Sequence, residues 1–318
     1  MPSRLSTDRQ EREHDGGRRL TRAQRIASEP FHDVSSRGGG TIRFIQEIWQ
    51  NRDLLGLLIR REVKARYKNS SLGVVWSLFR PLVQLLIYYF AIGQILGAAR
   101  FIPDFAIFVF IGLTVWSLFS EIVSGCTNAL ITNSGLVKKV YLPREIFPLS
   151  AVGGALFNFA VQLVVLLAAI AVLSTFPLDA RLLLAPLALL MLVIFSVAIG
   201  LVLSAVNVYL RDTEHLVEIG LVIFFWLSPI VYSFTFVHNA LNGSWLEQLY
   251  LANPITLAII AMQKALWYSG SEATGDLQQA WPDNLELRLL LALLVSLVLL
   301  WIAQRIFARL QGNFAQEL

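Results

Sequence analysis

The stretch "IRREVKARYKNSSLGVVWSLFRPLVQLLIYYF", residues 59–90, holds five Lys or Arg residues between Arg60 and Lys68 and then becomes almost wholly apolar. An apolar helix of roughly 20 residues is needed to cross a hydrocarbon core about 30 Å thick. Positive charge placed directly before such a segment is typical of the point where a chain enters a bilayer from the cytoplasm. The stretch therefore predicts an integral membrane protein whose first span follows a basic segment at the membrane surface.

The composition of the whole chain agrees with this interpretation. Of its 318 residues, 56% are hydrophobic and 15% are charged, whereas a soluble domain carries about 25% charged residues. The apolar residues are also gathered in long runs, so the predicted fold class is an all-α integral membrane protein. Six spanning helices are expected, at residues 74–97, 105–130, 146–173, 182–209, 216–237 and 285–304.

The distribution of Lys and Arg predicts the orientation of these spans. If the amino terminus is cytoplasmic, the segments on that side hold 14 Lys or Arg from residue 42 onward, and the opposite side holds four. Cytoplasmic loops carry the excess of Lys and Arg in membrane proteins. Both termini are therefore expected in the cytoplasm.

The parts outside the spans differ in composition. Residues 1–41 are polar and end in "SSRGGG", which predicts a disordered cytoplasmic tail, and residues 311–318 form a short cytoplasmic carboxyl-terminal tail. Residues 1–70 carry 15 Lys or Arg against nine Asp or Glu. Because this region lacks the interleaved aromatic residues that stack on bases, a lipid surface or a docking surface is favoured over nucleic acid.

Residues 42–73 are expected to hold an amphipathic interface helix before the transmembrane domain of residues 74–310. On a helical wheel the basic side chains of Arg60, Arg61, Lys64 and Lys68 share one arc, opposite Leu58 and Ile59, although Glu62 interrupts the apolar side. Such a helix would lie along the inner interface, with its basic side chains toward lipid phosphate or toward a protein. The pattern by itself favours lipid anchoring.

The long segment between the fifth and sixth predicted spans, residues 238–284, contains an apolar run at residues 255–267. This run is too short to cross the bilayer, which predicts re-entrant or interfacial helices on the outer side. The Trp and Tyr residues around it suit the headgroup level. A simple aromatic belt and a role in contacting sugar are both open interpretations.

No catalytic or metal-binding pattern is present. The sequence contains no G-x-x-x-x-G-K-[S/T] loop, nucleophile elbow or H-E-x-x-H helix, so no ATP site or catalytic residue is expected in this chain. The single cysteine, Cys126, and four scattered histidines show no metal-ligand spacing. Glu121 is the clearest charge within a span, and its isolation favours a structural hydrogen bond or a polar pathway wall over proton coupling.

Aromatic residues are abundant within the spans, and a subset lining a cavity could stack on sugar rings. Pro229 in "FFWLSPIVYSF" should kink or break the fifth helix, which makes Ser228 and Pro229 a candidate hinge, although a plain kinked helix is an equal alternative. Together with Glu121 and this hinge, the candidate pathway residues are Tyr88, Tyr89, Trp116, Phe119, Phe225, Trp226 and Tyr232.

Five motifs occur in an order and spacing that resembles ABC-2 type permeases exporting lipid-linked polysaccharides: "LIRREVKARYKNSSLGVVWSLFRPL", "GLVKKVYLPREIFPLS", "VNVYLRDTEHL", "LSPIVY" and "NPIT". That group serves O-antigen, capsule, teichoic acid and cell-wall galactan export in bacteria. The resemblance covers about residues 50–310. It implies a permease in the bacterial cytoplasmic membrane, working as a homodimer with two copies of a separate ATPase subunit that holds ATP and Mg.

The resemblance also implies roles for individual residues. The interface helix and the loops after the second and fourth spans would face the ATPase, and Asn253 and Pro254 match the re-entrant outer region. The ATPase-coupling candidates are Arg60, Arg61, Lys64, Lys68, Gly135, Lys138, Lys139, Tyr141, Pro143, Arg144, Glu145, Arg211 and Asp212. Two alternatives stay open: a membrane glycosyltransferase and a proton-driven flippase, both acting on polyprenyl-linked glycans.

Overall fold

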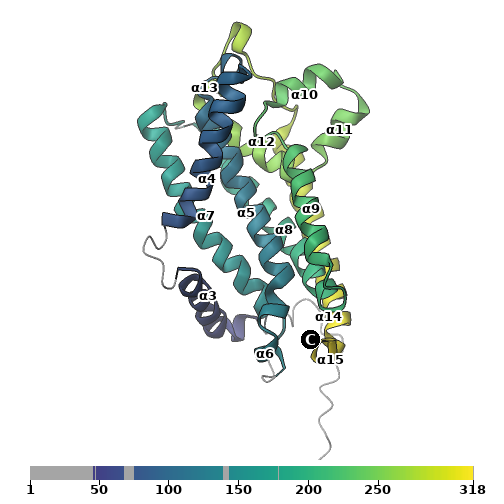
Figure 1. The fold of residues 1–318 in the computed structure, drawn as a ribbon. Coiled ribbons are helices and arrows are strands. Elements are labelled where there is room, and N and C mark those ends of the chain that lie inside the picture. Colours follow the sequence, from purple (N-terminus) through teal and green to yellow (C-terminus); the bar gives the residue numbers. More distant parts are fainter. Residues whose placement is uncertain (1–45, 47, 68–74, 139–142, 178, 318) are drawn as a thin grey trace, which may run out of the picture. The chain divides into compact units, whose positions relative to one another are not determined.

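The computed structural model describes residues 46, 48–67, 75–138, 143–177 and 179–317, and every regular element in these ranges is helical (Figure 1). The expected tail of residues 1–41 lies outside them. The longer helices are α3 (Arg52–Tyr67), α4 (Val75–Tyr88), α5 (Phe105–Thr132), α7 (Ile146–Leu173), α8 (Leu184–Tyr209), α9 (Thr213–Trp226), α12 (Pro254–Leu266) and α14 (Leu285–Leu310). The shorter α-helices are α6 (Ser134–Val137), α10 (Phe234–Leu241), α11 (Trp245–Leu251), α13 (Tyr268–Ser271) and α15 (Phe314–Glu317).

Within the described residues, four helices are long and apolar enough to cross a membrane, namely α5, α7, α8 with the turn before it, and α14. They match four of the six spans predicted from sequence. The pair α11 and α12 would make a fifth if it is one span, but its two helices are bent by 80°. The first and fifth predicted spans are shorter in the structure.

The first predicted span is an apolar helix over Pro81–Ile95. It begins within α4 and continues as a π-helix over Tyr89–Ile95. Inside this π segment Gly93 is buried, and a Cβ there would lie 2.9 Å from the ring of Phe105 at the start of α5. The helix is therefore packed directly on α5 at the far end of its apolar stretch.

The fifth predicted span is divided. Helix α9 ends at Trp226 and the next helix, α10, begins at Phe234. Pro229 lies in this interval, where it has no backbone N–H to donate and disfavours helical geometry at the residue before it. Since an α-helix rises about 1.5 Å per residue, the 14 residues of α9 cover only about 21 Å.

Helix α5 lies at the centre of the bundle. In its most apolar stretch of 18 residues, 72% is buried inside the protein, compared with 17% in the corresponding stretch of α14. Helix α5 packs against α7 and α8, and α14 packs against α8. The crossing of α5 and α8 is close, because a Cβ at Gly200 would lie 2.7 Å from the Cβ of Cys126. The exposed apolar face of α14 suits contact with lipid.

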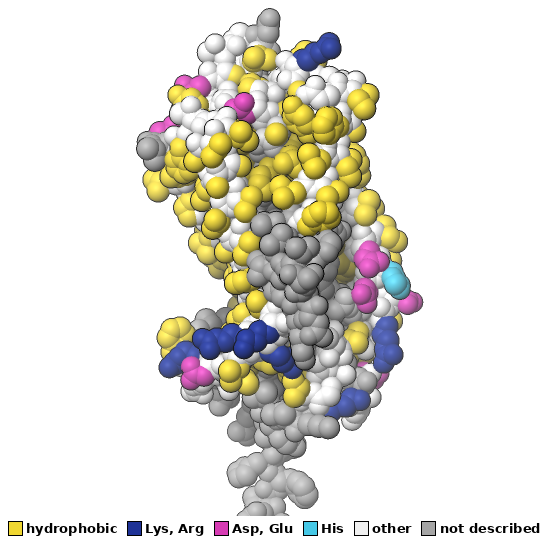
Figure 2. Space-filling view, turned by 60° about the vertical axis from the view of Figure 1, so that its left-hand side comes forward, with side chains coloured by type: hydrophobic (Ala, Val, Ile, Leu, Met, Phe, Trp, Pro, Cys, Tyr) yellow, Lys and Arg dark blue, Asp and Glu magenta, His cyan; other side chains and the backbone are white. Residues whose placement is uncertain are grey.

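The interface helix α3 packs on α7 rather than standing free. Leu58 is buried, and a Cβ at Gly153 of α7 would overlap the side chain of Ile59. Glu62, which interrupts the apolar side in the sequence, accepts a 3.3 Å hydrogen bond from the hydroxyl of Ser150. The apolar face of α3 is thus taken by protein, and Lys and Arg side chains gather along its outer face (Figure 2).

Candidate functional site: a polar network and an aromatic cluster on α5

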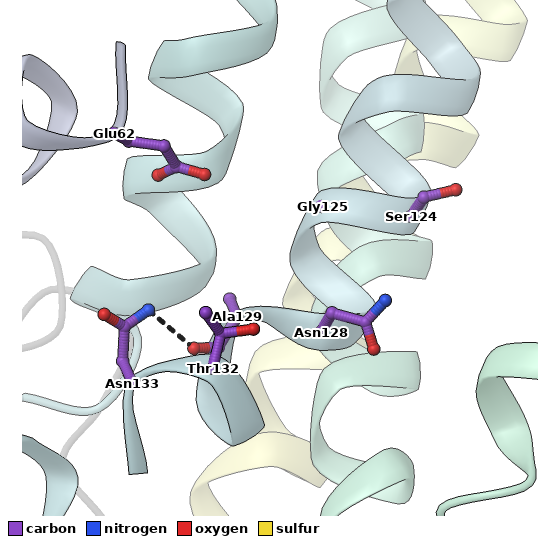
Figure 3. Close-up of a pocket in the computed structure, with 7 residues that line it drawn as sticks. All are labelled: Glu62, Ser124, Gly125, Asn128, Ala129, Thr132 and Asn133. Atoms are coloured by element: carbon purple, nitrogen blue, oxygen red, sulfur yellow. Dashed lines mark hydrogen bonds between the residues drawn. The ribbon is translucent and has the colours of Figure 1, made fainter. Parts of the chain in front are cut away.

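The last turn of α5 is bonded to the interface helix. Asn133 follows α5 directly and precedes α6, and its side-chain oxygen accepts a hydrogen bond from the guanidinium of Arg61 on α3. Its amide nitrogen donates to the carbonyl of Ala129 at 2.8 Å, as Figure 3 shows. Asn133 therefore joins α3, α5 and the start of α6. Of these three helices, α3 and α6 lie in segments that the sequence predicts to face the ATPase.

One turn earlier, α5 is bonded to the other side of the bundle. Asn128 donates to the carboxylate of Glu214 in the first turn of α9 at 2.9 Å. The side-chain nitrogen of Asn207 on α8 donates to the carbonyl of Thr127 at 2.9 Å and to the side-chain oxygen of Asn128 at 3.2 Å. We call Asn128, Asn207 and Glu214 the α5–α9 network.

A cavity of about 290 Å³ adjoins both sets of hydrogen bonds. Glu62 reaches it from α3, and the other lining residues lie along the end of α5 (Figure 3). They are Ser124, Gly125, Asn128, Ala129, Thr132 and Asn133. Carboxylate, amide and hydroxyl groups form part of the lining of this cavity, and space next to the network allows its members to move.

Arg144, between α6 and α7, is packed against the carboxyl-terminal helix. Its guanidinium carbon lies 5.7 Å from the ring centre of Phe314, which is fully buried. Phe314 also meets Phe307 at 5.5 Å and Tyr209 at 6.0 Å, both edge to face. Burial lowers the pKa of Arg144, and the nearby Glu145 carboxylate acts in the opposite direction.

The remaining coupling candidates lie on three segments around this end of the bundle. Pro143 is half-buried and Glu145 is buried beside Arg144. Lys68, Lys139 and Tyr141 fall outside the described residues. The exposed candidates are Arg60, Arg61, Lys64, Gly135, Lys138, Arg211 and Asp212. Exposed charge is therefore available on α3, after α6 and between α8 and α9.

Most of the predicted pathway aromatics form one cluster on α5, centred on Phe225 of α9. The ring of Phe225 stacks with Tyr88 at 6.0 Å and meets Trp116 edge to face at 5.5 Å. Trp226 is 5.6 Å from Phe225, and Phe119 is 5.5 Å from Trp116. The structure thus brings α4, α5 and α9 together through these rings, whereas Tyr89 pairs with Phe90 instead.

The break after α9 is held by specific contacts. The hydroxyl of Ser228 donates to the carbonyl of Phe224 at 2.8 Å, and buried Gln263 on α12 donates to the carbonyl of Pro229 at 2.9 Å. Tyr232 donates to the carbonyl of Trp226 at 3.0 Å. The polar groups released by the broken helix are satisfied within the protein, as a membrane environment requires.

Glu121 is hydrogen-bonded to a neighbouring helix, and Asn253 and Pro254 begin helix α12. Asn158 on α7 donates to the carboxylate of Glu121 on α5 at 2.7 Å. The side chain of Asn253 caps α12 by accepting from the backbone N–H of Ile255 at 3.0 Å, and Pro254 is the first residue of that helix. This cap and the proline start α12 at the 80° bend.

Sequence reasoning placed Asn133 in a segment expected to face the ATPase, but it did not predict which residues link the segments. Asn128, Asn133 and Glu214 are common polar residues near helix ends, where such residues usually cap or face water. Phe314 is one aromatic residue in a short polar tail. The available signals were the position of the two asparagines at the end of a span and the single ring in that tail.

Long apolar helices around a buried central helix, with charged segments at one end, define a multi-pass membrane protein. The sequence profile described as ABC-2 type transporter matches residues 53–267. The chain belongs to this family. Together with the membrane-spanning helices, this membership points to a multi-pass protein of a bacterial inner membrane.

Two relatives carry more specific descriptions. One is the O-antigen export system permease protein RfbA of Myxococcus xanthus, which is 31% identical over 277 residues, covering 87% of this chain and 100% of the relative. A Klebsiella pneumoniae protein of the same description is 29% identical over 212 residues, covering 67% of this chain and 79% of the relative. Both are described as permeases of an export system.

Proposed function

We propose that this chain is the transmembrane subunit of an ATP-driven ABC exporter that moves a lipid-linked polysaccharide across the bacterial cytoplasmic membrane. The observation that carries the proposal is the 31% identity that extends over the full length of an O-antigen export permease. The match covers 87% of this chain and the whole of the relative.

The aromatic cluster supports a glycan as the cargo. The apolar C–H faces of a pyranose pack on aromatic rings, while its hydroxyls need donors and acceptors at the ring edges. Tyr88, Trp116 and Phe225 offer such surfaces on three different helices. The passage would open between α4 and α9, with Ser228 and Pro229 as the hinge.

Membership of the ABC-2 family implies an ABC ATPase as the partner. This chain has no phosphate-binding loop, so ATP and Mg would be bound by the partner alone. Two ATPase copies would dock against α3, α6 and the turn between α8 and α9, where exposed basic residues include Arg60, Lys64 and Lys138. Closure of the ATPase dimer would push these segments.

The finer topology belongs to the same proposal. Helices α4 and α9 would complete six spans, with both termini in the cytoplasm and with α11 and α12 as a re-entrant pair at the outer face. The bend of 80° between these two short helices supports the re-entrant assignment. A second copy of the chain would cover the exposed apolar residues of α4 and α9, among them Leu86, Ile87, Ile219 and Val222.

Glu121 bears on the alternative of proton-driven transport. Because its carboxylate is engaged by Asn158, the hydrogen bond supports a structural role for Glu121 rather than a place in a proton relay. A glycosyltransferase would need carboxylates arranged for a metal and a nucleotide sugar, and among the described residues no such group of potential metal ligands is found.

The proposal is tested by purifying the chain with an ABC ATPase from the same organism that binds it and reconstituting the complex in vesicles. Export of a lipid-linked glycan should require ATP hydrolysis and should stop with an ATPase inhibitor. Energised export by this chain without any ATPase would overturn the proposal.

A second test addresses the coupling segments. Charge reversal at exposed Lys138 should lower the export obtained per ATP hydrolysed, because the contact with the ATPase would be weakened. Exposed Arg100, which the proposed topology places on the outer side, is the matched control for charge reversal. Unchanged coupling after Lys138→Glu would remove this segment from the ATPase contact.

A further inference from the structure

We infer that the hydrogen bond between Asn128 and Glu214 carries the movement of the coupling segment α6 to helix α9, which makes both residues positioning residues for export. This inference rests on the proposed function. It concerns a link within the chain, on the side opposite the contact between Arg61 and Asn133.

Helix α5 is continuous between the two linked positions. Asn133, which joins α3 and α6, follows directly after α5, and Asn128 lies five residues before it in the same helix. A helix segment of this length moves as a rigid body, because each backbone N–H is bonded to the carbonyl one turn earlier. A displacement of α6 is therefore a displacement of Asn128, and the 2.9 Å bond passes it to Glu214.

Helix α9 is held to α5 near both of its ends. Glu214 bonds its first turn to α5, and Phe225 near its last residue meets Trp116 on α5. Between these points one narrow side of α9 packs inward, with Val217 and Leu221 half-buried. The other side faces away from the rest of this chain, with exposed fractions of 68%, 60% and 62% for Leu216, Ile219 and Val222, and the proposed second copy would cover it. A shift at Glu214 would thus tilt α9 and move Phe225.

The α5–α9 network borders a cavity and contains a hydrogen-bond acceptor without a donor among the described residues. Asn128 lines the cavity of about 290 Å³. The side-chain oxygen of Asn207 is buried and meets no hydrogen-bond donor among the residues that the structure describes. Burying an acceptor without a partner is unfavourable, so an arrangement that satisfies it would compete with the present one. The network is therefore suited to exchange partners during a cycle.

Substitutions can also reverse the direction of this hydrogen bond, in which Asn128 donates and Glu214 accepts. Asn128→Asp replaces the amide donor by a carboxylate next to Glu214, and two carboxylates at this distance repel each other. Glu214→Gln keeps an oxygen that can accept from Asn128. In the double variant Asn128→Asp/Glu214→Gln, the new amide at position 214 donates to the new carboxylate at position 128, which still accepts from Asn207.

The test uses the full chain in complex with its ATPase in lipid nanodiscs and requires no glycan. Leu216→Cys, on the side of α9 that the proposed second copy would face, is labelled with a maleimide with and without ATP, and native Cys126 is fully buried. We expect ATP to change the labelling rate in the parent. Asn128→Asp should reduce this ATP response by about tenfold, within the usual range for coupling between two sites.

The other variants separate coupling from folding. Glu214→Gln should keep most of the response, and the double variant should restore it. Glu218→Gln, at an exposed carboxylate on the same helix, should have no effect. Basal ATP hydrolysis should change little in all variants, because the ATPase itself is untouched.

The outcomes are distinguishable. An undiminished ATP response in Asn128→Asp, or no recovery in the double variant, would overturn the inference. So would a loss of response that only parallels a loss of basal hydrolysis and of thermal stability, because that result indicates a purely structural bond. A parent chain that binds no ATPase would instead overturn the proposed function, and this inference with it.

Discussion

The phenolic hydroxyl of Tyr209, the last residue of α8, donates a 2.7 Å hydrogen bond to the main-chain carbonyl of Leu310, the last residue of α14. This bond ties the end of α14 to the end of α8. It holds the turn that places Phe314 against Phe307 and Arg144. The final residues are therefore part of the folded end that carries the coupling candidates.

Phe314→Ala should destabilise the protein by about 3–5 kcal/mol, as expected for removing a fully buried aromatic side chain. Arg144 would lose the ring beneath it, so the segment before α7 should loosen as well. The thermal midpoint of the purified chain in detergent measures the first effect, and protease cleavage near Arg144 measures the second. The exposed Gln316 provides the control Gln316→Ala, and equal midpoints for the two variants would contradict the prediction.

Gln263→Leu should lower stability by about 1–3 kcal/mol, because the carbonyl of Pro229 would remain buried without a donor. The substituted side chain is similar in size, so the effect isolates the hydrogen bond. Gln278→Leu at an exposed position is the control. If the thermal midpoint of Gln263→Leu equals that of the control, α12 does not hold the break after α9.

Gly153→Ala should weaken the packing of α3 on α7 by about 1–3 kcal/mol, the usual range for overpacking. The added methyl group would overlap Ile59. Labelling of a cysteine introduced at buried Leu58 would report the separation of the helices, and adding Ile59→Ala should reverse the increase. Gly220→Ala, where no atom lies within 4 Å of the new Cβ, should be neutral or stabilising by up to about 1 kcal/mol.

Phe225→Ala should reduce export far more than Phe224→Ala. Phe225 meets the rings of Tyr88, Trp116 and Trp226, whereas its neighbour Phe224 has an exposed fraction of 43%. Losing about 0.5–1.5 kcal/mol for each aromatic pair would loosen α9 from α4 and α5. Export of surface glycan by cells that carry each variant is the measurement. Similar export by both variants, at equal protein level, would count against a role for the cluster.

Four spans could be predicted closely from sequence. Helices α5, α7 and α14 begin at the predicted residues 105, 146 and 285, and α8 ends at the predicted residue 209. These runs are continuous and apolar, and lipid leaves a single helix as the conformation that satisfies their backbone. The fifth predicted span is also an apolar run, but Pro229 divides it into α9 and α10.

The candidate site could be predicted only in part. Residue type was sufficient to select rings such as Trp116 and Phe225, and the structure brings them together. It was not sufficient to select Asn128 and Glu214, since an amide and a carboxylate 86 positions apart carry no mark of their pairing. The direction in which each side chain points depends on how its helix is rotated, and packing decides that rotation.

The sequence by itself determined that this chain crosses a membrane, which segments form its four longest helices, and that it has no phosphate-binding loop for ATP. These properties follow from local composition, because the cost of exposing polar backbone to lipid acts on each segment separately. Only the tertiary structure decided that the apolar face of α3 lies on α7, that Phe314 closes over Arg144, and that Asn128 bonds α9. Each of these contacts joins residues distant in sequence, and close packing around α5 selects them.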